Sequence, residues 1–109
     1  MSLSAAPREF PFTLPHGYTD PAGVTHREGV MRLATENDEL APLVDQRVRE
    51  NPSYRGVVLL SLVITRLGTK DQPDPQVIES LFPADLAHLQ KLYREINGTE
   101  LPGGLPDTV

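Results

Sequence analysis

The chain has 109 residues, a length that fits one domain with a modest core. The absence of cysteine excludes disulfide bonds, thiolate–metal sites and cysteine nucleophiles. A formal net charge of −5 provides no basic field for phosphate backbones, so we expect no nucleic-acid partner. No signal peptide and no apolar run of membrane-spanning length is visible, so we expect a cytoplasmic protein without membrane contact.

The N-terminal part of the chain is predicted to form a β-hairpin. Phe10, Phe12 and Leu14 occupy every second position, which is the pattern of a strand with one buried face. The sequence DPAG at residues 20–23 is typical of a tight turn, because Pro presets φ at the second position and Gly closes the turn. The return strand, residues 24–33, has no clean apolar face. This predicts a strand at the edge of a sheet or one that faces a partner.

A short helix is predicted to follow the hairpin, from about Glu36 to Val44. Thr35 is a suitable N-cap for this helix. Acidic residues in the first turn suit the helix dipole. Leu40, Leu43 and Val44 then form an apolar stripe at helical spacing.

The apolar run from Val57 to Leu67 has two interpretations. Its composition alone fits a buried strand. We favour a central helix, because Asn51 and Pro52 give a start signal and Gly68 follows as a C-terminal cap. The apolar residues cover most of the circumference of that helix, which predicts that it is largely buried.

Two more helices complete the predicted fold. Asp74 and Pro75 open a short third helix, and the last helix runs from Ala84 to Asn97. We therefore predict an α+β fold, an N-terminal β-hairpin followed by a small bundle of about four helices. Residues 10–98 form this single domain, and residues 1–9 and 99–109 are expected to be flexible.

The histidines are the best candidates for metal chemistry in this sequence. His16 and His26 can face each other across the hairpin, with Glu28 on the same face, and these ligand types suit zinc. A polar strand face accounts for the same residues without a metal, and we favour that interpretation. Asp85 and His88 lie three apart on the last helix, where an exposed pair is commoner than a catalytic dyad. We expect no enzyme activity, no metal and no cofactor.

Two groups of residues are candidates for binding a protein partner. The first lies on the return strand, to which a partner segment can add as an extra strand, and the alternative is a solvated edge. The second is a group of arginines around Asn51 that can grip a carboxylate, and the alternative is a solvated loop that balances the acidic turn before it. The candidate residues are His26, Arg27, Glu28, Met31, Arg47, Arg49 and Arg55.

Several short motifs resemble those of a known family. They are TLPHGY at residues 13–18, HREGVMRLAT at 26–35, VITRLG at 63–68 and IESLF at 78–82. Arg32, Thr35 and Asp38 match an Arg-x-x-Thr-x-x-Asp helix start, and Asp85 begins the Asp-Leu pair of the last helix. In these features residues 14–97 resemble the small tail assembly proteins, or tail assembly chaperones, of Mu- and P2-type contractile-tailed phages and their prophage-derived relatives. Many relatives have proline where this chain has Ala34.

The resemblance implies a non-enzymatic assembly factor in a bacterial or phage-infected cell. Such a protein holds an aggregation-prone tail or tape-measure component while the tail is built. A permanent structural subunit of a tail or contractile injection machine is one alternative, and a small metal- or ligand-binding protein is another. Self-association is a further contact to consider, because it would cover the edge of the hairpin.

Overall fold

The computed structural model describes residues 8–103, which form an α+β fold. Its strands are β1 (Glu9–Thr19), β2 (Thr25–Arg32), β3 (Ile64–Leu67) and β4 (Lys70–Asp71), and they make one antiparallel sheet in the order β1-β2-β3-β4. Its α-helices are α1 (Glu36–Leu40), α2 (Gln46–Glu50), α3 (Arg55–Val63), α4 (Pro75–Glu79) and α5 (Pro83–Asn97). The 3-10 helices are η1 (Ala41–Val44), which follows α1, and η2 (Pro52–Tyr54), which precedes α3.

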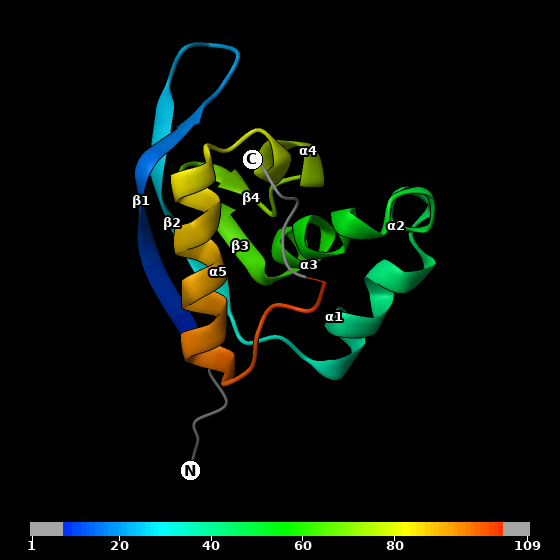
Figure 1. The fold of residues 1–109 in the computed structure, drawn as a ribbon. Coiled ribbons are helices and arrows are strands. Elements are labelled where there is room, and N and C mark those ends of the chain that lie inside the picture. The colour runs from blue at the N-terminus through cyan, green and yellow to red at the C-terminus, as the bar shows by residue number, and fades with distance from the viewer. Residues whose placement is uncertain (1–7, 104–109) are drawn as a thin grey trace.

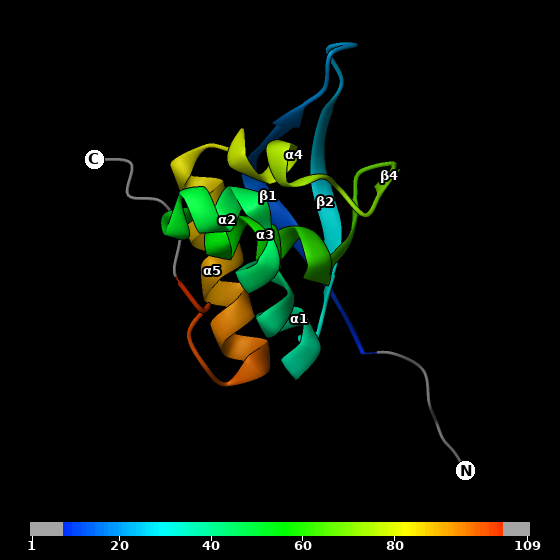
Figure 2. The same ribbon diagram turned by 90° about the vertical axis from the view of Figure 1, so that its right-hand side faces the viewer.

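The helices lie on one face of the sheet, and no element within residues 8–103 covers the other face (Figures 1 and 2). The longest helix, α5, packs along β1, while α3 packs against α4 and leads directly into β3. The core forms between these layers, with Leu14 and Met31 from the sheet and Leu60, Leu89 and Tyr93 from the helices all fully buried. The predicted α+β class is thus confirmed, whereas the structure does not confirm a separate helical bundle. None of the helices within residues 8–103 is long and apolar enough to cross a bilayer.

The predicted hairpin and its turn are confirmed. Strands β1 and β2 pair antiparallel, and the end of the hairpin projects beyond the body of the molecule (Figure 1). In the turn, the Asp20 carboxylate accepts hydrogen bonds from the backbone N–H groups of Ala22 and Val24, both at 2.9 Å. Gly23 has φ +87°, a left-handed conformation that glycine adopts without strain.

The prediction that the return strand is an edge strand is wrong. Strand β2 pairs with β1 on one side and with β3 on the other, so it is an interior strand of the sheet. Met31 faces the core and is 0% exposed, so it is not part of an exposed face. The mixed polarity of the return strand comes from its residues near the turn, in the part of the hairpin that projects beyond β3. These residues made the whole strand look like an edge strand.

The prediction of a helix up to Leu67 is wrong in its last four residues. Helix α3 ends at Val63, Ile64 turns to an extended conformation, and residues 64–67 become strand β3. Ile64 and Leu67 are buried while the residues between them are partly or fully exposed. Gly68, with φ +62°, is the turn into β4 and not a helix cap, and its N–H donates to the Glu28 carbonyl at 2.7 Å. Pairing with β2 therefore decides the conformation of a segment whose apolar composition fits either structure.

The later helix boundaries follow the sequence closely. Pro75 occupies the first turn of α4 behind the N-cap Asp74, and Gly98 closes α5 with φ +77°. After α5, Leu101 is 3% exposed and belongs to the core, although it lies in the segment expected to be flexible. Glu9, in the N-terminal segment expected to be flexible, is the first residue of β1. Residues 1–7 and 104–109 of the predicted flexible segments lie outside the described residues.

Candidate partner-binding surface

An exposed apolar patch lies on α1 and η1. It consists of Leu40, Leu43 and Val44, whose exposed fractions are 52%, 46% and 77%. Helical spacing predicted these residues as one stripe, which in a small domain usually faces the core. In the structure the regular helix stops at Leu40, and the last four residues form the 3-10 helix η1, with Pro42 near its start. Pro42 is the buried residue of this segment, and the stripe points to solvent.

Polar bonds hold this segment on the domain, and this explains why its apolar side chains stay exposed. Arg32 donates two hydrogen bonds to the Asp38 carboxylate, at 2.6 and 3.0 Å, and also bonds the carbonyl of Leu62. Thr35 and Asp38 form a reciprocal capping box at the start of α1. α1 itself contains no buried residue. Charge and hydrogen bonds thus anchor α1, while Leu40 of α1 and Leu43 and Val44 of η1 stay exposed.

A second anchor ties α1 to the last helix. The Tyr93 hydroxyl donates to the Glu39 carboxylate at 2.5 Å, and Tyr93 is 0% exposed. Burial, together with the bond to Glu39, raises the pKa of Tyr93 well above its usual value, so the hydroxyl keeps its proton. For Asp38, the bonds from Arg32 lower the pKa from 3.8 to about 2. These are the electrostatic supports of the patch.

Replacing Asp38 by Asn is expected to destabilise the fold by about 2 kcal/mol at neutral pH. Because its folded-state pKa is depressed, the carboxylate stabilises the fold fully above pH 3.8, and this contribution is lost as the pH falls through about 2. Denaturant unfolding of both proteins at a series of pH values measures the effect, and the gap should close in acid. Glu36→Gln is the control, since Glu36 is an exposed acid of the same first turn. Equal losses in the two variants would contradict the Arg32–Asp38 anchor.

The return-strand candidates do not form one surface. His26 is mostly buried, packs against Tyr18 and bonds the Asp20 carboxylate at 2.8 Å. Arg27 donates to the carbonyl of Leu14, and Glu28 is exposed. Strand addition along β2 is blocked where β1 and β3 already pair with it.

The candidate arginines are also dispersed. Arg47 pairs with Asp45 at 2.7 Å and lies 5.8 Å from the centre of the Tyr54 ring. Arg55 points inward and donates to the carbonyl of Glu39 at 3.4 Å. Arg49 is exposed on α2. The structure therefore shows no single pocket in which the three guanidinium groups converge on a carboxylate.

The proposed zinc ligands are not brought together. His26 lies opposite Tyr18 in the β1–β2 pairing, and the His16 ring instead meets Phe82 edge-on at 5.4 Å. Within residues 8–103 there is no cluster of three or more side chains that could hold a metal ion. His16 and His26 thus contact different aromatic side chains, Phe82 and Tyr18, and do not converge on one site.

Asp85 has a role that the sequence did not reveal. It is not an exposed partner of His88, because its side chain is 0% exposed. Its two carboxylate oxygens accept the backbone N–H groups of His16 (2.8 Å) and Gly17 (2.9 Å), where β1 bulges away from β2. Gly17 has φ +100°, and a Cβ there would lie 2.7 Å from the side chain of Arg27. This contact joins residues that are far apart in the sequence, so neither the bulge sequence nor the helix sequence predicts it alone.

Comparisons of the chain with protein-family models, with curated proteins and with solved structures found no match.

Proposed function

We propose that this protein is a non-enzymatic assembly factor of a phage-like contractile tail. It binds a tail or tape-measure component in the cytoplasm of a bacterial or phage-infected cell, and it covers apolar surface of that component until assembly is complete. The observation that carries the proposal is the exposed patch of Leu40, Leu43 and Val44. A group of exposed apolar side chains on one short segment, held on the domain by the Arg32–Asp38 and Tyr93–Glu39 contacts, fits a protein-interaction site.

The contacts of the motif residues support the proposal. Arg32, Thr35 and Asp38, which carry part of the resemblance, are the residues that fix the start of α1. Asp85, from the Asp-Leu pair of the last helix, ties α5 to the β1 bulge. The motif residues thus help to position α1, which leads into η1 and the patch, and to position α5 against β1.

Co-expression with each tail and tape-measure protein of the same genome tests the function. We expect the wild-type protein to keep one of them soluble and to co-purify with it. Leu43→Asp is expected to weaken that binding roughly tenfold or more, because a charge would be buried at the centre of the contact. Titration of the purified partner gives the affinity.

The matched control is Val24→Asp. Val24 is exposed to 52%, like the residues of the patch, but it lies at the end of the hairpin. We expect this variant to bind like wild type. Wild-type affinity of Leu43→Asp, or an equal loss in both variants, would contradict the patch as the binding site.

The composition of finished tails separates an assembly factor from a permanent subunit. We expect mass spectrometry of purified particles to find the partner and not this chain, because the patch is covered only during construction. Stoichiometric amounts of the chain in finished particles would make it a structural subunit instead.

A further inference from the structure

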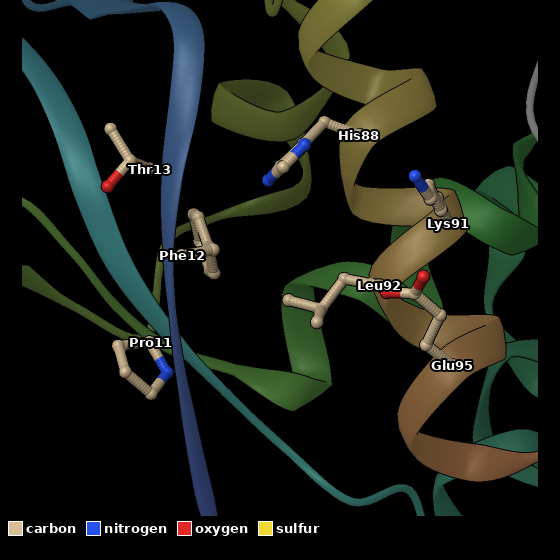
Figure 3. Close-up of a pocket in the computed structure, with 7 residues that line it drawn as sticks. All are labelled: Pro11, Phe12, Thr13, His88, Lys91, Leu92 and Glu95. Atoms are coloured by element: carbon tan, nitrogen blue, oxygen red, sulfur yellow. The ribbon is translucent and has the colours of Figure 1, made fainter.

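A second surface, separate from the patch, lies between β1 and α5. A groove of about 430 Å3 runs there, lined by residues 11–13 of β1 and by His88, Lys91, Leu92 and Glu95 of α5. Figure 3 shows Phe12, His88 and Leu92 directed into the groove, with Lys91 and Glu95 along the helix at its rim. In Figure 1, β1 lies on one side of α5 and α1 on the other.

The strand that borders the groove is poorly suited to accept another strand. The carbonyls of Glu28 and Val30 accept bonds from the β3 side, from Gly68 N–H and Thr65 Oγ1. Pro11, which is opposite Val30, therefore directs its backbone away from β2 and toward the open edge of the sheet. Proline has no N–H to donate, so this edge lacks a donor at the third residue of β1. An occupant that packs through side chains, such as a helix, therefore fits this edge better than an added strand.

Two charged residues at the rim of the groove, Lys91 and Glu95, indicate which charges a helix bound in the groove would need. Lys91 and Glu95 are exposed and one helical turn apart, and neither takes part in an ion pair within residues 8–103. The order Lys-then-Glu along a helix is the less favourable one for pairing within the helix. A helix packed antiparallel to α5 satisfies both charges if it places an acid opposite Lys91 and a base opposite Glu95. The sequence of α5 itself has that arrangement.

We propose that this groove is the interface of a homodimer, with a second copy of this chain as its occupant. The two α5 helices pack antiparallel about a two-fold axis near Leu92, so that Leu92 of one copy contacts Leu92 of the other. Lys91 of each copy then pairs with the second copy's Glu95, which makes the surface self-complementary as two-fold symmetry requires. The 15-residue helix α5 and the edge of β1 form a small interface, so we expect a weak dimer whose fraction depends on protein concentration. Because its ion pairs are exposed, salt should weaken it further.

Charge exchange gives a direct test by sedimentation equilibrium over a range of protein concentrations. Wild-type protein should form dimers. Lys91→Glu and Glu95→Lys should each weaken dimerisation roughly tenfold, because each turns both symmetric ion pairs into repulsions. The double variant carrying Lys91→Glu and Glu95→Lys should recover the wild-type constant to within about threefold.

The control is Arg94→Glu, which changes an exposed charge elsewhere on the same helix and should leave dimerisation unchanged. Circular dichroism of each variant verifies that the fold is intact, since all three positions are exposed. A wild-type monomer at every concentration would overturn the proposal. So would single variants that dimerise normally, or a double variant that does not recover. Binding of a tail component through the patch can succeed or fail independently of these results.

Discussion

Leu60→Ala is expected to lower the free energy of unfolding by roughly 2–5 kcal/mol. Leu60 is 0% exposed on α3, the helix that packs against α1, α4 and β3. Removing its side chain leaves a cavity at the point where the sheet and the helices meet, and the surrounding chain can collapse into such a cavity only in part. Denaturant unfolding followed by circular dichroism measures the loss.

Leu62→Ala is the matched control for this prediction. Leu62 is the same residue type on the same helix, but it is partly exposed. Its truncation should cost clearly less than that of Leu60, because solvent already reaches the side chain. Equal costs, or a cost of less than about 1 kcal/mol for Leu60→Ala, would show that α3 is not packed as the structure has it.

Asp85→Ala is expected to destabilise the protein by roughly 3–5 kcal/mol. The change removes both acceptors of the His16 and Gly17 N–H groups and leaves the Gly17 donor buried without a partner. Bonds to a charged group are stronger than neutral ones, and an unsatisfied buried donor adds its own cost. Because the bulge joins the hairpin to α5, amide hydrogen exchange at residues 16–19 should also become faster.

Asp85→Asn separates the hydrogen bonds from the packing of the side chain. Asparagine keeps the shape and one acceptor oxygen, so we expect about half the loss seen with alanine. If Asp85→Ala unfolds at the wild-type denaturant concentration, or if exchange at Gly17 stays slow, Asp85 is not what holds the bulge.

Local signals in the sequence predicted most of the element boundaries. The turn at residues 20–23, the N-cap Thr35, the start of α4 at Asp74 and the end of α5 at Gly98 all lie where the sequence places them. Each depends on backbone preferences or hydrogen bonds that reach only a few residues along the chain. Such signals can be read without knowledge of the rest of the fold.

Contacts between distant segments could not be predicted in the same way. Residues 64–67, predicted as helix, form a strand because they pair with β2, which lies more than thirty residues earlier in the chain. That pairing also moves β2 from the edge of the sheet to its interior. In the sequence, Asp85 looks like any acidic residue in the first turn of a helix. Only the fold brings it to Gly17 in the β1 bulge, 68 residues away.

The candidate site shows the same division. The residues of the patch were identified as one stripe from their spacing, and they do lie on one segment. Their exposure could not be predicted, because it depends on the Arg32–Asp38 and Glu39–Tyr93 anchors taking the place of apolar packing. Helical spacing predicts which residues share one face of a helix, but the whole fold decides whether that face points to the core or to solvent.

Site-specific photo-crosslinking in cells that are assembling tails tests the central claim most directly. A photoreactive residue placed at Leu43 should crosslink to one tail or tape-measure component, identified by mass spectrometry. The same residue at Val24, equally exposed but on the hairpin, should not. A crosslink to that component from Val24 and none from Leu43 would contradict the account, because the partner would then bind the hairpin and not the patch on α1 and η1.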